Sequence, residues 1–207
     1  MKTKFVILLG LSIILLSGCA SNRPAIGHRE IVGRVPNVEP EWKGRSFWEK
    51  KEVFNYVGAV DNRTDMALCV REARAEGEKQ LAEQIRQRIR TEFGSALEGQ
   101  NMDGNTGSYV KDLIAKVSEN VQVSGVKQAE TFVEKVEETT GFGVKNSFTC
   151  FALLALDRVD YLEARKAAVD GTLAQVRQAQ NAKAEESLKE AFEKLDGGAP
   201  SAGAAGQ

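Results

Sequence analysis

Residues 146–156 read NSFTCFALLAL, and this stretch determines the predicted fold. Apolar residues occupy both of its alternating sets of positions. One set is Phe148, Cys150, Ala152, Leu154 and Leu156, and the other is Phe151, Leu153 and Ala155. Because successive side chains of a strand point to opposite faces, a strand with this pattern must be covered on both sides. We expect an earlier helix to cover one face, and the C-terminal helix, a second subunit or a membrane-facing partner to cover the other.

That earlier helix is predicted between residues 65 and 93. Its apolar positions recur three or four residues apart, at Met66, Val70, Ala73, Gly77, Leu81, Ile85 and Ile89. This spacing puts them on one stripe of a helix. The polar residues 61–64 supply turn and capping groups before the helix, and the apolar run 53–60 predicts a buried strand.

The middle of the chain predicts a loop, a helix and a strand. Residues 98–108 are polar and rich in glycine, which favours a flexible loop. Residues 109–121 carry apolar residues at helical spacing, which predicts a second helix. Residues 123–136 favour a strand with one face exposed to solvent. Residues 137–143 then turn the chain into the strand at 146–156.

The C-terminal part predicts one long helix over residues 157–195, with a bend at Gly171. Its last apolar residues are Leu188, Ala191, Phe192 and Leu195. They indicate either an end that docks on a partner helix or a frayed, solvated end, and the sequence leaves both interpretations open.

Together these elements predict an α+β fold, in which a small, mainly antiparallel sheet is covered by a long amphipathic helix and followed by a long C-terminal helix. The predicted divisions are a lipoprotein signal peptide at 1–18, a lipidated tether at 19–41, an α+β lipoprotein domain at 42–162, a C-terminal helix at 163–196 and a disordered tail at 197–207.

The first nineteen residues are typical of a secretory leader. Two lysines precede an apolar run at residues 5–16, which as a helix would rise only about 18 Å, well short of the roughly 30 Å hydrocarbon core. Residues 16–19, LSGC, resemble the bacterial lipobox, in which the cysteine is diacylated and the leader is cut before it. We therefore expect lipidation of Cys19, with a chance cysteine as the alternative. Ala20 is not the Asp that retains some lipoproteins at the inner membrane, which indicates an outer-membrane protein facing the periplasm.

The composition argues against several functional classes. The 28 basic and 29 acidic residues give a net charge of −1, so nucleic acid is not an expected partner. One histidine and three cysteines are too few ligands for an ordinary structural zinc site, and we expect no metal or cofactor. His28 has no accompanying nucleophile, and the adjacent Glu137 and Glu138 lack a pocket that would separate their pKa values. We therefore expect no catalytic residues, and a hydrolase is the least favoured class.

Cys69 and Cys150 are candidates for a disulfide, because the compartment outside the inner membrane is oxidising. Cys69 lies close to the buried stripe of the predicted helix, and Cys150 lies on the strand that this helix is expected to cover. The bridge would close a loop of 150 − 69 − 1 = 80 residues. Two buried thiols are the alternative, and the sequence does not decide between them.

Three further motifs resemble ligand sites only weakly. Asp103, Asn105 and Gly107 suggest a calcium loop, but Ile114 stands where a bidentate glutamate is needed, so a flexible linker is favoured. The glycines of residues 141–143 favour a hairpin over a phosphate loop. The arginines at positions 86, 88 and 90 are interpreted as a solvated helix face, with anionic lipid or glycan binding as the alternative.

Four short motifs resemble the LPP-twenty lipoprotein family, which also takes in flagellar assembly lipoprotein P. They are Pro40-Glu41-Trp42, Tyr56-Val57-Gly58-Ala59, an alanine-rich helix through Ala73, Ala75, Leu81 and Ala82, and CFALLALD at 150–157. The resemblance covers about residues 42–157, and Gly77 departs from it where the helix pattern favours alanine. It implies a helix-on-sheet domain on an outer-membrane lipoprotein used for assembly or envelope structure, with no catalytic residues.

We therefore expect a non-enzymatic outer-membrane lipoprotein that is a structural or assembly component of the cell envelope, with a flagellar association as one form. Its expected partners are the membrane, through the lipid anchor, and either copies of itself or another envelope protein. The alternative is a periplasmic module that binds or activates a peptidoglycan enzyme or binds glycan.

Overall fold

The computed structural model describes residues 24–98 and 102–197. The predicted signal peptide, the predicted lipidation site Cys19 and residues 198–207 of the predicted tail lie outside the described residues.

Five antiparallel strands form one sheet, in the order β1-β4-β5-β3-β2. The strands are β1 (Arg29–Val35), β2 (Phe47–Lys50), β3 (Val53–Arg63), β4 (Lys127–Thr140) and β5 (Gly143–Asp157). The doubly apolar stretch 146–156 lies in β5, at the centre of the sheet, where both of its faces are covered. The antiparallel sheet, its covering helix and the helices after it confirm the predicted α+β fold.

The strands β4 and β5 form a long hairpin, as the glycines at 141 and 143 predict. Thr140 pairs with Gly143 across a two-residue turn, and Gly143 has φ +126°, a conformation that L side chains rarely adopt. The strand β5 is longer than predicted, and β4 lies four residues later than predicted, because residues 137–140 continue it up to the turn instead of forming a loop.

The long helix α2 (Met66–Leu97) begins at Asp65, whose side chain accepts a hydrogen bond from the backbone N–H of Leu68 at 2.7 Å. Its first half covers β3 and β5. Gly58 of β3 and Gly77 of α2 meet there, and a Cβ built on Gly58 would lie 2.1 Å from the carbonyl oxygen of Ala73. This backbone contact explains why glycine, not alanine, occupies position 77 of the helix stripe.

The second half of α2 extends beyond the sheet and packs with three further helices, α3 (Gly104–Glu119), α4 (Arg158–Gln178) and α5 (Ala182–Gly197). The helix α3 begins earlier than predicted, because the Asp103 side chain caps it by accepting from the N–H of Thr106 at 2.8 Å. Residues 104–108 are therefore helical and not loop.

The predicted C-terminal helix over residues 163–196 is divided in two. The break lies at residues 179–181, where Gln180 has φ +55°, and α4 continues through Gly171 as one helix. The helix α5 folds back against α2 and α4, which buries Leu188, Ala191 and Phe192 within the chain's own core. Of the two interpretations, docking on a partner helix is therefore confirmed, with α2 and α4 of the same chain as the partner helices, and the end is not frayed.

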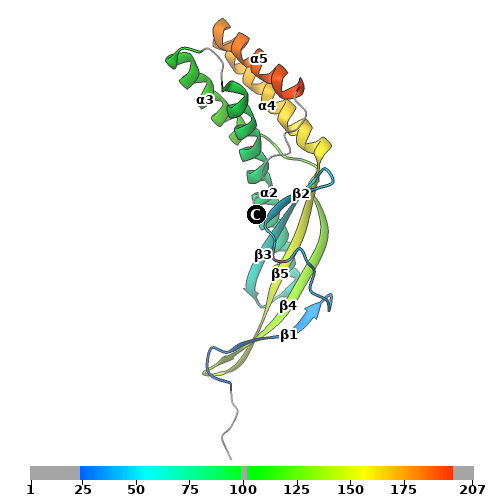
Figure 1. Ribbon diagram of the computed structural model, residues 1–207. Helices are drawn as coiled ribbons and strands as arrows, with labels where there is room; N and C mark the ends of the chain where they lie inside the picture. Colours follow the sequence, from blue (N-terminus) through cyan, green and yellow to red (C-terminus); the bar gives the residue numbers. More distant parts are fainter. Residues whose placement is uncertain (1–23, 99–101, 198–207) are drawn as a thin grey trace, which may run out of the picture.

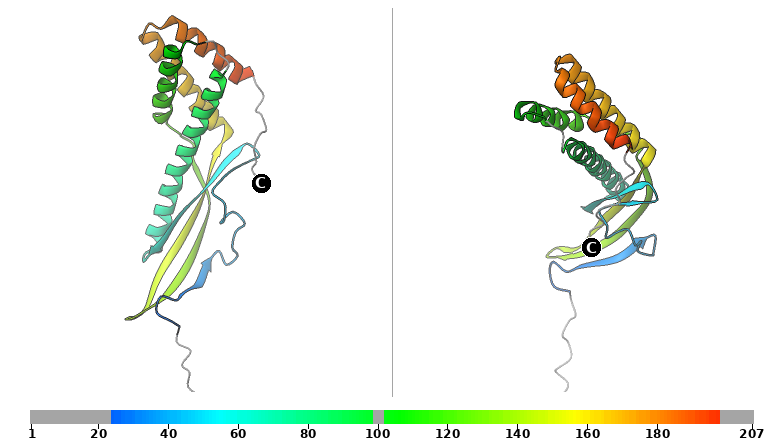
Figure 2. Two further views of the ribbon diagram at one scale, coloured as in Figure 1. Left: turned by 60° about the vertical axis from the view of Figure 1, so that its left-hand side comes forward. Right: turned by 45° about the horizontal axis from the view of Figure 1, so that its top comes forward.

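The molecule is elongated, with the sheet at one end and the four-helix bundle of α2, α3, α4 and α5 at the other (Figures 1 and 2). The segment 19–41, predicted to be a tether without regular structure, contains the edge strand β1. A break in its pairing between Ile31 and Gly33 interrupts the alternation of apolar residues, which explains why the sequence pattern did not reveal the strand.

Candidate functional site

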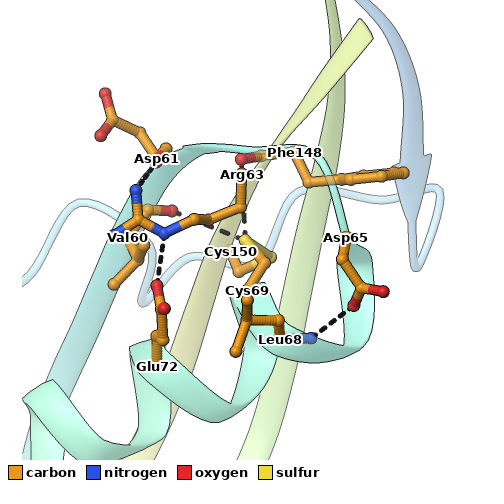
Figure 3. The surroundings of a disulfide bond; sticks show 9 residues. All are labelled: Val60, Asp61, Arg63, Asp65, Leu68, Cys69, Glu72, Phe148 and Cys150. Atoms are coloured by element: carbon orange, nitrogen blue, oxygen red, sulfur yellow. Dashed lines mark hydrogen bonds and ion pairs between the residues drawn. A yellow bond between two sulfur atoms is a disulfide. The ribbon is translucent and has the colours of Figure 1, made fainter.

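The structure joins Cys69 and Cys150 in a disulfide, with Cα atoms 5.8 Å apart (Figure 3). Cys69 lies near the start of α2 and Cys150 lies on the central strand β5. Both are fully buried, and Ala73, Val133 and Ala152 surround them. The bridge attaches the beginning of the helix to the middle of the sheet, so these sulfur atoms are structural and do not form a metal or nucleophile site.

Polar contacts flank the disulfide where β3 turns into α2. Arg63 forms an ion pair with Glu72 on the first turns of the helix, and its guanidinium also donates to the carbonyl oxygen of Asp61 at 3.4 Å (Figure 3). Together with the Asp65 cap, these contacts fix the turn between strand and helix.

The second face of the sheet is covered by residues 40–45, not by the C-terminal helix, a second subunit or a membrane-facing partner as predicted. Trp42 packs on Val57, Phe132 and Leu153 and is 9% exposed. Its indole N–H donates to Glu130 Oε2 at 2.7 Å. Trp42, at the N-terminal boundary of the predicted domain, therefore forms part of the core.

A buried carboxylate fixes this covering segment to the sheet. The Lys43 ammonium lies 2.7 Å from Oε1 of Glu134, a residue that is only 5% exposed, and 5.4 and 5.2 Å from the ring centres of Phe132 and Phe151. Arg34 of β1 contacts the same carboxylate oxygen at 3.5 Å. Two cations from the N-terminal segment thus compensate one buried anion.

A groove of about 390 Å³ lies beside the covering segment. Its lining residues are Glu41, Trp42, Arg45, Trp48, Lys50, Lys51, Val53, Asn55 and Leu153. The Arg45 guanidinium stacks 5.5 Å from the centre of the Trp48 ring. Indole surface next to cationic and amide groups suits a planar or sugar-like ligand, whereas no Ser, Thr, Cys or His lies among the lining residues.

A partly buried arginine joins the sheet to the helical bundle. Arg88 of α2 lies 2.9 Å from Glu49 of β2 and 3.2 Å from Glu92, and it stacks over the Phe54 ring at 4.8 Å. Burial alone lowers the pKa of Arg88, but the two carboxylates outweigh this effect and its pKa is raised. Nearby, burial and then Glu92 raise the pKa of Tyr161 on α4.

The arginine run 86–90 is thus used within the protein. Besides the contacts of Arg88, Arg86 donates to the carbonyl oxygen of Val121 at 3.0 Å and Arg90 pairs with Glu119 at 3.2 Å. The predicted solvated face is wrong for Arg88, which belongs to the junction between the sheet and the bundle.

The weaker ligand motifs also have structural uses. Asp103 caps α3 and pairs with Lys183 of α5 at 2.8 Å, and these contacts, the lysine first, hold the pKa of Asp103 well below its usual range. Glu137 and Glu138 are successive residues of β4 and so point to opposite faces of the sheet.

Within residues 24–98 and 102–197, no group of three or more His, Cys, Asp or Glu side chains is placed to hold a metal ion. Among the described helices, none combines the length and apolar character that crossing a membrane requires.

The outer edge of β1 exposes apolar side chains. Ile31, Val32 and Val35 are 42%, 44% and 63% exposed, although the strand lies in a folded sheet. An unpaired strand edge with apolar side chains is a surface on which another chain can pair or pack.

Sequence reasoning missed two parts of this surface, β1 and the covering segment. Trp42, the first residue of the predicted domain, offered a signal, since a large aromatic residue is costly to expose and the residues around it would have to pack on the sheet. The β-branched residues at positions 31, 32 and 35 offered a second, weaker signal.

Comparisons with protein-family models, with curated proteins and with solved structures found no match. The resemblance to the LPP-twenty family therefore stays a prediction.

Proposed function

We propose that this chain is a non-enzymatic lipoprotein of the outer membrane, anchored through Cys19 and facing the periplasm, that serves as a structural or assembly component of the cell envelope. The observation that carries the proposal is where the described chain starts, at residue 24: Gly27 and His28 are hydrogen-bonded to Thr139 beside the β4–β5 turn, and this turn lies at the end of an elongated molecule opposite the helical bundle (Figure 1). Only 24 − 19 − 1 = 4 residues separate residue 24 from the predicted lipidation site. Such an anchor would hold the sheet near the membrane and present the bundle away from it.

The connection between the two ends supports a spacer role. The 32 residues of α2 run without interruption from the sheet into the bundle, a length of about 48 Å at ~1.5 Å per residue. The contacts of Arg88 and the Cys69–Cys150 bridge attach this helix to the sheet. A disulfide also agrees with an oxidising compartment such as the periplasm.

The exposed edge of β1 supports assembly into a multisubunit structure. Subunits standing on one membrane share an orientation, so the edge of one could contact a neighbouring subunit side by side. The proposed partners are accordingly further copies of this chain or another envelope protein. A flagellar association rests on the family resemblance alone.

In-cell photocrosslinking tests this assembly. A photoreactive amino acid in place of Val32, on the β1 edge, should give crosslinked species that mass spectrometry identifies as this chain or as one envelope protein. The matched control replaces Val159, which is 66% exposed at the start of α4. Crosslinks equally weak at both positions, together with a monomer by light scattering of the detergent-solubilised protein, would contradict the assembly role.

A second function, binding of peptidoglycan glycan, is favoured by the groove beside Trp48. Its indole surface and cationic groups resemble the surroundings that sugar rings and their acidic substituents require. Pulldown on purified sacculi tests it. The wild type should be retained and Trp48→Ala should be lost, and equal retention of the two proteins would remove this function.

A further inference from the structure

The tip of the β4–β5 hairpin is a projection whose apolar side chains belong to no core cluster of the described residues. Phe142 is fully exposed, at 106%, and Val144 is 61% exposed. Residues 139–144, TTGFGV, contain no charged residue, whereas charged residues lie on both strands directly below the tip, at Glu138 and Lys145. A large exposed aromatic residue at the apex of an uncharged turn is an unfavourable surface in water and a favourable one at an apolar interface.

This tip lies beside the point where the N-terminal segment enters the fold. The N–H of Gly27 donates to the carbonyl oxygen of Thr139 at 2.7 Å, and the N–H of Thr139 donates to that of His28 at 2.9 Å. Residues 24–28 therefore run along the hairpin end, as all views show (Figures 1 and 2). They contain no Asp, Glu, Lys or Arg and expose Ile26 at 77%.

The length of chain before this point limits how far the tip can be from the anchor. Gly27 follows Cys19 by eight residues, which span at most about 28 Å when fully extended. The same end of the molecule therefore carries the entry of the segment predicted to be lipidated and three exposed apolar side chains, Ile26, Phe142 and Val144. The far end of the hairpin leads directly into α4, so the bundle is held away from this surface.

We propose that the β4–β5 hairpin tip, with Phe142 at its apex and Ile26 beside it, contacts the lipid surface in which Cys19 is anchored. This inference rests on the proposed lipid anchor. The acyl chains would hold the protein on the membrane, and the tip would provide a second contact that sets the tilt of the long axis and keeps the bundle pointing into the periplasm. Aromatic side chains at membrane interfaces serve as anchors of this kind.

Fluorescence quenching in vesicles tests the contact. The full-length, acylated Phe142→Trp variant is reconstituted in vesicles of phosphatidylethanolamine and phosphatidylglycerol that include lipids brominated near the headgroup end of the acyl chain. The matched control is acylated Val159→Trp, since Val159 lies beyond the opposite end of β5, about 50 Å along the strand. The emission of the wild type comes from Trp42 and Trp48, and it is subtracted from the emission of both variants.

We expect brominated lipid to reduce the added emission of the Phe142→Trp variant roughly twofold and to leave that of Val159→Trp unchanged. An acylated Phe142→Trp protein that floats with the vesicles but shows no quenching would overturn the hairpin contact and leave the lipid anchor intact. An unacylated mass and no flotation would overturn both. A blue shift that rises with protein concentration in detergent, without bilayers, would assign the tip to a protein partner and also overturn the proposal. Phe142 makes no core contact, so circular dichroism should show an unchanged fold.

Discussion

The contact between Gly58 and Gly77 makes a graded prediction for three glycine-to-alanine variants. A Cβ at position 58 would lie 2.1 Å from the carbonyl oxygen of Ala73 and 2.6 Å from the backbone nitrogen of Gly77. Both are backbone atoms of a regular helix, so relief requires the helix to move off the sheet. Because overpacking of a core commonly costs about 1–3 kcal/mol, we expect Gly58→Ala to lose about 3 kcal/mol of unfolding free energy or more.

Gly77→Ala should be milder for two reasons. Its Cβ would meet Cδ1 of Leu154 at 2.8 Å, an atom at the end of a flexible side chain, and backbone atoms of Gly58 only at 3.1 Å. Alanine also gains about 1 kcal/mol over glycine within a helix, which offsets part of the clash. We expect a net loss of about 1 kcal/mol.

Gly94 supplies the control within the same helix. It is exposed, and a Cβ there meets nothing within 4 Å, so Gly94→Ala should gain up to about 1 kcal/mol from helix propensity alone. Equilibrium urea unfolding, followed by far-ultraviolet circular dichroism, measures all three variants. Equal stability of Gly58→Ala and wild type would refute the close packing of α2 on β3.

Three further predictions concern the disulfide, the buried ion pair and the cap of α3. Replacing both Cys69 and Cys150 by alanine should cost about 4 kcal/mol in urea unfolding, since the bridge closes a separation of 81 residues, and dithiothreitol should then destabilise only the wild type. Lys43→Met should lower the free energy of unfolding by about 3 kcal/mol, because it leaves the buried Glu134 short of a cation. Adding Glu134→Gln should recover part of that loss. A double variant that is less stable than Lys43→Met would speak against the ion pair. Folding lowers the pKa of Asp103, so its ionised form stabilises the protein above about pH 4, and this contribution is lost as the pH falls further. Asp103→Asn should therefore lose less stability than wild type between about pH 5 and pH 2. Parallel curves of unfolding free energy against pH for the two proteins would contradict this role.

The sequence predicted the central strand, its covering helix and the fold class because these depend on local periodicity. The alternating apolar residues of 146–156 and the helical stripe through Leu81 and Ile85 are visible in any short window of the chain. Likewise, the glycines around Phe142 identified the hairpin through backbone conformation alone.

Features that depend on distant contacts could not be predicted in this way. The break at Gln180 has no glycine or proline to mark it. A local signal was Asn181, whose side chain accepts from the N–H of Ala184 at 3.1 Å and caps α5, but the packing of α5 on α2 also stabilises the break. Trp42 covers the sheet through contacts with Val57 and Phe132, which are remote in sequence. The sequence alone did not decide whether Cys69 and Cys150 are bridged, because only the crossing of α2 over β5 brings the two cysteines together.

Intact mass spectrometry of the protein purified from its native envelope tests the central proposal most directly. We expect a chain that begins at Cys19 and carries the added mass of a diacylglyceryl group, with or without a third acyl chain, and a Cys19→Ser variant without that mass. A chain with an unmodified Cys19, or one that retains residues 1–18, would contradict it.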